Sequence, residues 1–160
     1  FKEKQERKAV VIFMGHGPLE DEIKDSATEY SNIFYHAAVS PNTVLEFTSS
    51  ADIGISLIEN TCLSYYYCMP NKLFEYVMAG LPVLVSNMYD MAQFVQQNKV
   101  GVVVEDETPV SLHKAIALLL KMDLSTIKQN ALLAAKEHSW ETQEKKMVSA
   151  YSKLLDSNKC

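Results

Sequence analysis

The sequence predicts an α/β protein with a doubly wound parallel sheet, whose helices cover both faces. Short apolar runs bounded by turn residues alternate with longer stretches of helical pattern along most of the 160 residues. Strands that alternate with helices in this way are typical of βαβ units. About the last third of the chain has helical patterns only, so a helical C-terminal end should follow the sheet.

The first elements follow from an apolar run and from helix-start signals. Ala9–Met14 is continuously apolar and stops at Gly15–Pro18, which predicts a strand buried on both faces. Pro18 suits the start of a helix, and the acids of Glu20–Glu22 complement the positive end of its dipole. This helix should run to about Tyr30.

The next elements are predicted by the same patterns. They are a strand at 32–35, a loop at 37–40, a helix from Pro41 to about Ser50, and a strand at 52–57. Thirteen residues, Ile58–Pro70, then precede another helix. Connections in such units usually take about two to six residues, so this length suggests a functional loop.

The remaining elements complete the alternation and then leave it. A helix opens at Pro70 or Asn71, and after it come strands at 82–86 and 101–105 and helices at about 90–98, 109–121, 124–138 and 140–155, with Ser139 as a cap. Ligands of open parallel sheets bind outside the carboxyl ends of the strands. Four segments should therefore converge on a ligand: 15–18, 37–40, 58–71 and 86–90.

Bulk properties exclude several functions. A hydrophobic fraction of 48% and a charged fraction of 22% are ordinary for a soluble globular domain. The formal net charge of −5 argues against nucleic-acid binding, and the apolar runs are too short to span a bilayer. Three cysteines without a C-x-x-C pair, and histidines without partners at ligand spacing, predict free thiols, no metal site and no cofactor.

The most informative segment is MPNKLFEYVMAGLPVLVS, at residues 69–86. The first backbone N–H groups of its helix lack intrahelical partners and can bind phosphate, and Asn71 is expected to cap the helix. Lys72 can add a positive charge, and Glu75, about one turn further on, can accept hydrogen bonds from both hydroxyls of a ribose. The segment therefore predicts a site for a nucleoside diphosphate.

This segment also resembles the donor-binding motif of the retaining GT-B glycosyltransferases called glycosyl transferases group 1. That motif, P-[NS]-K-L-F-E-Y-x-x-x-G-x-P-V-[IVL], stands here as PNKLFEYVMAGLPVL. Further segments are similar to family motifs in the family's order and extend the resemblance over essentially the whole chain: Met14–Glu20, Ser50–Ser56, Gly101–Asp106 and Ser139–Glu141.

The resemblance implies both fold and function. The chain should be the Rossmann-like, C-terminal half of a GT-B fold and bind a nucleotide-diphospho-sugar, UDP- or GDP-linked, for transfer to a glycan or lipid-linked acceptor. The acceptor domain and the first strand of this domain are expected outside residues 1–160, so this stretch alone should be inactive. The resemblance implies a cytoplasmic enzyme of polysaccharide biosynthesis, with peripheral association at the inner face of the cell membrane as an alternative, and it assigns no catalytic residue here.

Candidate site residues follow from the motif and from the resemblance. Those for the donor nucleotide and diphosphate are Glu75, Lys72, Asn71, Leu73, Gly15, Gly17, Val39 and Ser40, and those for the sugar or a pocket wall are Tyr67, Pro70 and His16. Several have structural alternatives. Lys72 can be a surface lysine, and the glycines can serve only a tight turn. Tyrosines 65–67 can form a pocket wall that contacts the sugar or base, or they can only anchor the loop.

One departure from the family leaves other functions open. The family commonly has a second glutamate eight residues before Glu75, where this chain has Tyr67, and Glu59 lies too early to replace it. Some members with this motif variant also lack that glutamate. The alternatives are half of a nucleotide-sugar 2-epimerase, which shares the fold and a related donor site, and a non-catalytic nucleotide-sugar-binding module, which Tyr67 favours.

Overall fold

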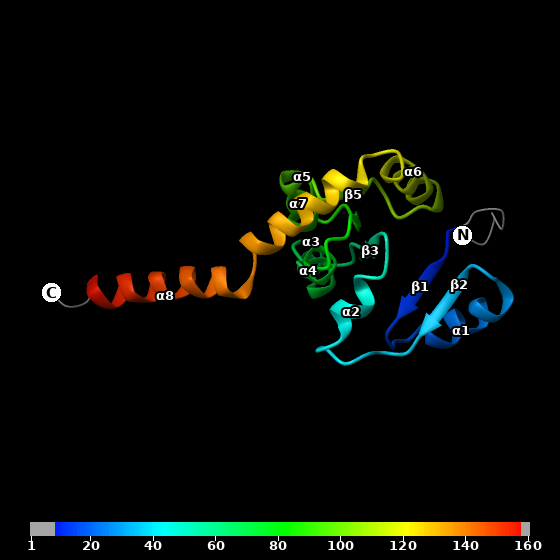
Figure 1. The fold of residues 1–160 in the computed structure, drawn as a ribbon, viewed down its shortest axis with the longest axis horizontal. Coiled ribbons are helices and arrows are strands. Elements are labelled where there is room, and N and C mark those ends of the chain that lie inside the picture. Colours follow the sequence, from blue (N-terminus) through cyan, green and yellow to red (C-terminus); the bar gives the residue numbers. More distant parts are fainter. Residues whose placement is uncertain (1–8, 158–160) are drawn as a thin grey trace. The chain divides into compact units, whose positions relative to one another are not determined.

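The computed structural model describes residues 9–157, and the chain divides into two compact units, Phe1–Val44 and Leu45–Cys160 (Figure 1). Every strand pair is parallel, and strands alternate with helices in both units, as predicted. The strands form a two-stranded sheet in the first unit and a three-stranded sheet in the second.

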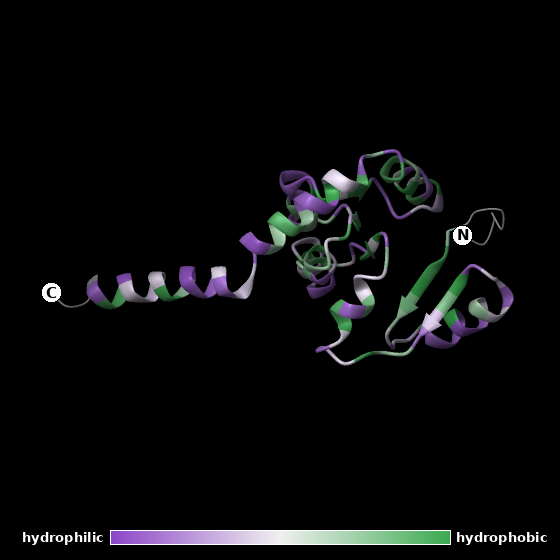
Figure 2. Cartoon of the chain, viewed as in Figure 1, coloured by the Kyte–Doolittle hydropathy of each residue, from purple (hydrophilic) through white to green (hydrophobic). Residues whose placement is uncertain are grey.

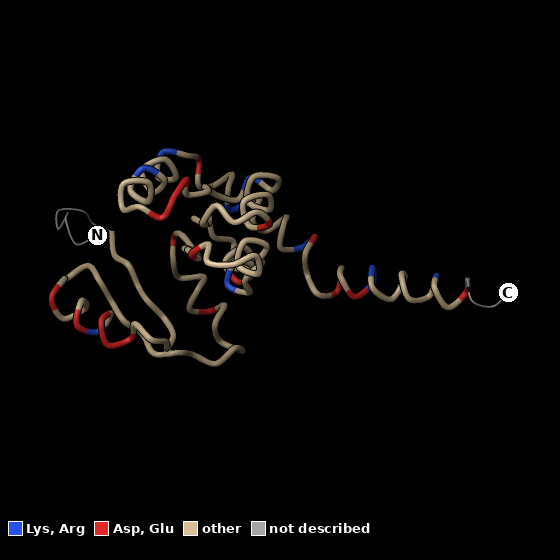
Figure 3. The backbone as a smooth tube through the Cα atoms, turned by 180° about the vertical axis from the view of Figure 1, so that it is seen from behind, with Lys and Arg blue, Asp and Glu red and all other residues tan. Residues whose placement is uncertain are grey.

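The first unit is one βαβ element: β1 (Val11–Met14), α1 (Glu20–Glu29) and β2 (Ile33–His36). The carboxylate of Glu20 accepts hydrogen bonds from Lys24 Nζ at 2.6 Å and from the Tyr35 hydroxyl at 2.9 Å. The bond from Lys24 lies within α1 and the bond from Tyr35 joins α1 to β2, and both lower the pKa of Glu20. The predicted acidic first turn is confirmed, and Figure 3 shows the acids of α1 in red.

The prediction that Ala9–Met14 is buried on both faces is wrong for the described structure. Ile12 is 60% exposed and Phe13 is 43% exposed. Within residues 9–44, β1 pairs with β2, and α1 packs mainly against β2, so these elements do not enclose both faces of β1. The strand is nevertheless strongly apolar, as its green colour in Figure 2 shows.

The second unit holds the motif helix and most of the other predicted elements. Helix α2 (Val44–Thr48) leads into it. The elements that follow are β3 (Gly54–Ser56), α3 (Leu63–Tyr66), α4 (Asn71–Met78), β4 (Val83–Ser86), α5 (Tyr89–Asn98), β5 (Gly101–Val104), α6 (Pro109–Leu119), α7 (Leu124–Glu137) and α8 (Trp140–Ser157). No helix in residues 9–157 has the length and apolar character that crossing a membrane requires.

Three local predictions meet different outcomes. The helix expected from Pro41 begins only at Val44, because the Ser40 carbonyl first closes a turn by accepting from the N–H groups of Thr43 and Val44. The long connection expected as a loop contains the short helix α3. The cap expected at Ser139 is confirmed, because its Oγ accepts from the N–H of Thr142 at 3.4 Å.

Strand β4 lies at the centre of the second sheet, between β3 and β5, and all its residues are buried. Val83 and Val85 face a core formed with α4, α5 and α7. Leu84 faces the opposite core, formed mainly with β5 and α6. Helices therefore cover both faces of this sheet, as a doubly wound fold requires.

Two glycines allow the close packing around β4. A Cβ on Gly101 would lie 1.8 Å from the Val83 carbonyl oxygen, and one on Gly54 would lie 2.2 Å from the Cγ of Tyr76. Both contacts are far shorter than a real Cβ contact, so a side chain at either position would push elements apart. Gly54 thus allows α4 to lie close to β3, and Gly101 allows β5 to lie close to β4.

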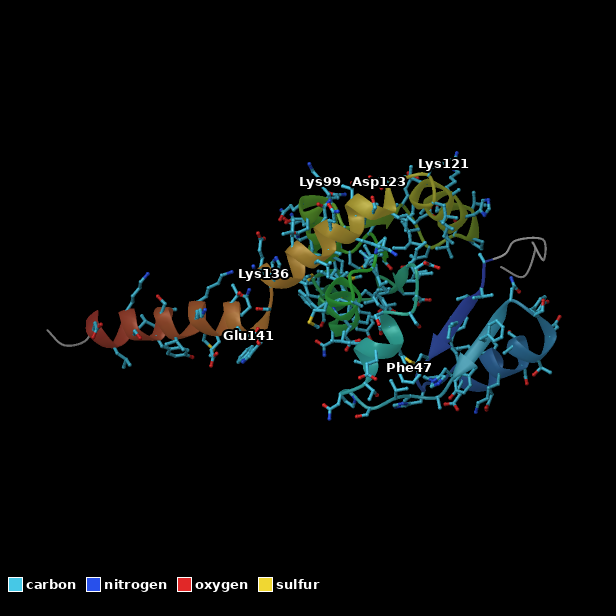
Figure 4. The ribbon with its side chains drawn as sticks, viewed as in Figure 1. Phe47, Lys99, Lys121, Asp123, Lys136 and Glu141 are labelled. Atoms are coloured by element: carbon cyan, nitrogen blue, oxygen red, sulfur yellow. The ribbon has the colours of Figure 1, made fainter. Side chains whose placement is uncertain are left out.

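Asp123, labelled in Figure 4, is the capping residue at the start of helix α7. The Asp123 carboxylate accepts hydrogen bonds from Ser125 N at 3.0 Å, Ser125 Oγ at 2.6 Å and Thr126 Oγ1 at 2.6 Å. These bonds favour the charged carboxylate and lower the pKa of Asp123 from an ordinary 3.8 to about 2.

This cap predicts a pH-dependent contribution to stability. Because the folded pKa is depressed, the contribution is fully present above the ordinary value of 3.8 and is lost as pH falls through about 2. Asp123→Asn keeps an accepting oxygen but does not titrate. The stability advantage of the natural chain over Asp123→Asn, measured by urea unfolding, should therefore shrink between these pH values. An advantage that stays constant across this range would contradict the assignment.

Candidate functional site

The start of α4 presents free backbone donors. Pro70 occupies the N-cap position with extended backbone, and its carbonyl accepts from the N–H of Leu73 at 3.0 Å. The N–H groups of Asn71 and Lys72 have no acceptor among the residues that the structure describes. The prediction that Asn71 caps the helix is wrong, because Asn71 is the first helical residue and makes no side-chain cap. An anion can occupy the place that a capping oxygen would take.

Lys72 and Glu75 lie on one face of α4. They are three residues apart, a spacing that puts side chains side by side on a helix. Lys72 is exposed and Glu75 is partly buried. Neither side chain makes a hydrogen bond or an ion pair within residues 9–157, so both are available to a ligand.

The opposite face of α4 is firmly packed. Leu73 is 0% exposed and Val77 is 1% exposed, and the ring of Phe74 meets that of Phe94 edge to face with centroids 5.6 Å apart. The Tyr76 hydroxyl donates to the Ile55 carbonyl at 3.1 Å, and burial raises the pKa of this phenol. The side chain of Leu73, a predicted donor-site residue, therefore belongs to the core and does not face a ligand.

A cavity of about 920 Å³ opens at the carboxyl ends of the second sheet. Segments 57–60 after β3, 86–89 after β4 and 104–107 after β5 line it. Two of the four predicted ligand segments thus lie together, whereas 15–18 and 37–40 belong to the first unit, and their convergence on the same site stays a prediction. Lys72 and Glu75 are not among the lining residues.

The cavity includes residues that the sequence interpretation missed. Glu105, Asp106 and Glu107 follow the buried strand β5 directly, at the sheet edge where ligands bind. This polar run after an apolar strand was the available signal. Asp106 itself has a structural role: its carboxylate accepts from Thr108 Oγ1 and, at 2.9 Å, from Thr108 N at the start of α6, and these bonds lower its pKa.

Three tyrosines cluster beside the cavity. The rings of Tyr66 and Tyr67 have centroids 4.9 Å apart, and Tyr89 lies 6.0 Å from the first and 5.5 Å from the second. Tyr66 and Tyr89 line the cavity, whereas Tyr67 contacts both rings without being a lining residue. Of the three tyrosines expected as a pocket wall, only Tyr66 lines this cavity, and contact of Tyr67 with a sugar stays a prediction.

The first-unit candidates occupy the turns after β1 and β2. Gly15 has φ +137°, a backbone conformation that a residue with a side chain rarely adopts, so the turn itself explains this glycine. Gly17 has no such φ and open space around it, and His16 is exposed. Val39 is partly buried, and Ser40 Oγ accepts from Asn42 N at 3.4 Å. Their ligand roles stay predictions.

Comparison with known proteins identifies the family. Residues 1–147 match the family model described as glycosyl transferases group 1, and the chain therefore belongs to that family. A search of curated proteins gave no match.

Comparison with solved structures shows the fold. The crystal structure of WaaG, a glycosyltransferase involved in lipopolysaccharide biosynthesis, is similar with a TM-score of 0.61 and 17% identity. The match covers 81% of this chain and 34% of WaaG, so the chain spans about a third of that protein's length. The family and the shared fold confirm the predicted class, the C-terminal half of a GT-B fold.

Alanine substitutions at Gly15 and Gly17 should have different effects on stability. Gly15→Ala should lower the free energy of unfolding by about 1–3 kcal/mol, because a side chain at this φ is strained. Gly17→Ala should leave it nearly unchanged, because nothing lies within 4 Å of the added Cβ. Chemical denaturation of the two variants checks this. Equal losses would show that Gly17 also has a structural role.

Proposed function

We propose that this chain binds the nucleotide part of a UDP- or GDP-sugar at the start of α4 and is the donor-binding part of a glycosyltransferase. Glu75 is the observation that carries the proposal. Its carboxylate is partly buried, has no partner within residues 9–157 and lies one turn from free N–H groups and from Lys72. A carboxylate in such a place is well suited to a ligand with hydroxyl donors.

The diphosphate would bind the helix start. The N–H groups of Asn71 and Lys72 and the positive end of the helix dipole favour an anion there. The ammonium of Lys72 adds a charge-assisted hydrogen bond. These groups contact the diphosphate directly, and the proposal includes no metal ion.

The ribose would bind Glu75. Lys72 and Glu75 share one helix face, so a nucleotide whose phosphates lie at Lys72 can place its ribose one turn along α4. An ionised carboxylate accepts hydrogen bonds from two hydroxyls at once. Since Leu73 and Val77 anchor the opposite face, this geometry exists before the ligand arrives.

In the whole enzyme, we expect this site to hold the donor while another domain holds the acceptor. Such catalysis works by positioning two substrates and by stabilising the departing diphosphate. A glycan or lipid-linked acceptor fits the family, and WaaG, similar in fold, is involved in lipopolysaccharide biosynthesis. A cytoplasmic enzyme of polysaccharide synthesis, free or at the inner face of the membrane, is the proposed setting.

Glu75→Gln tests the ribose contact. The change keeps the size of the side chain but replaces an accepting oxygen with a donor, so UDP or GDP binding should weaken by about 1.5–3 kcal/mol. Binding of inorganic pyrophosphate, which has no ribose, should be nearly unchanged. Titration calorimetry with both ligands measures the difference.

Glu144→Gln is the matched control, because Glu144 is an exposed helical glutamate on α8. It should leave both affinities unchanged, and thermal melts of both variants should match that of the natural chain. An unchanged nucleotide affinity in Glu75→Gln, or an equal loss for pyrophosphate, would remove Glu75 from the ribose site.

Lys72→Ala tests the diphosphate contact. Loss of a charge-assisted hydrogen bond should weaken UDP binding by about 1.5–3 kcal/mol and leave uridine binding nearly unchanged. Lys146→Ala, at an exposed lysine of α8, is the control. Equal losses for UDP and uridine would show that Lys72 does not contact phosphate.

A further inference from the structure

The side of helix α6 that faces water has an unusual composition. Its inner side is anchored in the core of the second unit, where Ala115 and Leu119 are buried. A helix that covers a sheet normally presents polar and charged residues to water. On α6, however, Val110 is 63% exposed and Leu118 is 54% exposed, and the ribbon of this helix is largely green in Figure 2. The outer side of α6 therefore carries large apolar side chains that the core does not use.

The exposed apolar residues continue past the end of α6. The N–H groups of residues 120–122 donate to carbonyls in the last turn of the helix, so the helical path extends to Met122. Most of the exposed side chains are spaced by three or four residues, which puts them on one face, and Leu120 and Met122 flank that face. Six exposed side chains form the surface that we call the α6 patch: Val110, Lys114, Leu118, Leu120, Lys121 and Met122.

The charge of the α6 patch is opposite to that of the chain as a whole. Between Glu107 and Asp123 the sequence has two lysines and no acidic residue, whereas the chain has a formal net charge of −5. Neither Lys114 nor Lys121 makes an ion pair or a side-chain hydrogen bond within residues 9–157. The carboxylates of Asp106 and Asp123, at the two ends of the patch, are engaged in helix caps. The patch therefore offers positive charge to an anionic partner.

The apolar side chains of the patch stand on the outside of a helix and not in a hollow. None of them lines the cavity of about 920 Å³ at the strand ends, or the cavity of about 260 Å³ that Phe74 and Trp140 line. Protein partners gain most of their affinity from side chains that fill pockets. A lipid surface instead accepts apolar side chains that project from a helix, while lysines beside them extend their ammonium groups to the headgroups. The shape and charge of the patch together favour a lipid surface.

We propose that the α6 patch docks this chain on a membrane surface that contains anionic lipids. Helix α6 would lie in the plane of the interface, with the apolar side chains of the patch below the headgroups and the two lysines at the lipid phosphates. Each lysine near such a surface strengthens binding about fivefold. The inference rests on the proposed setting at the inner face of the membrane, for which it names the contact surface, and it does not depend on the donor site.

Sedimentation of the 160-residue chain with lipid vesicles tests the proposal. One set of vesicles is pure phosphatidylcholine, and the other has two parts phosphatidylcholine to one part anionic phosphatidylglycerol. The chain should bind the anionic vesicles at least tenfold more tightly, and high salt should weaken this binding because it screens the lysines. Equal binding to both sets would overturn the proposal. Absence of binding to the anionic set would also overturn it, in favour of an acidic protein partner.

Paired lysine variants locate the charged contact. The double variant Lys114→Gln/Lys121→Gln should weaken binding to the anionic vesicles at least tenfold, because it removes both charges of the patch. The matched double variant Lys145→Gln/Lys146→Gln, at exposed lysines of α8, should stay within twofold of the natural chain. Equal losses in the two double variants would show that overall charge, and not the patch, attracts the vesicles, and would overturn the proposal.

Paired leucine variants locate the apolar contact. Leu118→Gln should weaken binding to the anionic vesicles at least fivefold, because it removes an inserted side chain. Leu133→Gln on α7 and Leu155→Gln on α8, at two other exposed leucines, should stay within twofold. An equal loss in either control would show that another apolar surface meets the lipid, and would overturn the proposal. Thermal melts check folding, and the lysine pair decides if Leu118→Gln does not fold.

The same samples separate this proposal from the donor site. Lys72→Ala should leave vesicle binding unchanged, and saturating UDP should not release the chain from the vesicles. If Lys72→Ala abolishes vesicle binding, the start of α4 holds the lipid phosphates and the α6 patch is excluded. If UDP binds the chain and vesicles do not, the patch proposal fails and the donor site stands. If vesicles bind and UDP does not, the patch stands and the donor site fails.

Discussion

The packing of Tyr76 against Gly54 is the contact on which the proposed donor site depends. Because Gly54 has no side chain, the tyrosine ring lies where a Cβ would come within 2.2 Å of it. The hydroxyl of the same ring reaches the Ile55 carbonyl, so α4 is fixed to β3 by an apolar contact and a hydrogen bond together. This pairing sets the rotation of α4 about its axis. The rotation puts Leu73 and Val77 in the core and leaves Lys72 and Glu75 on the free face.

In the second unit, positive and negative groups lie in different places. The start of α4 offers backbone N–H groups and the ammonium of Lys72, whereas the cavity at the strand ends offers carboxylates and amides and no basic side chain. Attraction between unlike charges and repulsion between like charges are strongest where water is partly excluded. A diphosphate is therefore favoured at the helix and disfavoured in the cavity, while an uncharged sugar experiences neither effect.

Features set by local chemistry could be predicted from the sequence. The motif helix, the central strand and the cap at Ser139 depend on neighbouring residues, and all are found as expected. The helix cap at Asn71 failed because Pro70, with fixed φ, took the N-cap position and left Asn71 inside the helix. The burial of β1 failed because burial depends on which distant elements cover a strand. The cavity wall at 104–107 was missed although it follows an apolar strand at the predicted edge of the sheet, because none of the four expected ligand segments included the residues after β5.

The structure explains why the connection between β3 and α4 is long. Its first residues line the cavity, its middle forms α3 with Tyr66 on the wall, and its last residue, Pro70, starts the motif helix. The connection is held at both ends. Near β3, the N–H of Ile58 donates to the buried Ser86 Oγ at 2.5 Å, and near α4, Cys68 Sγ lies 3.7 Å from Met91 Sδ. A connection of ordinary length would reach α4 directly but could not also build a wall, so one segment forms part of both sites and fixes the distance between them.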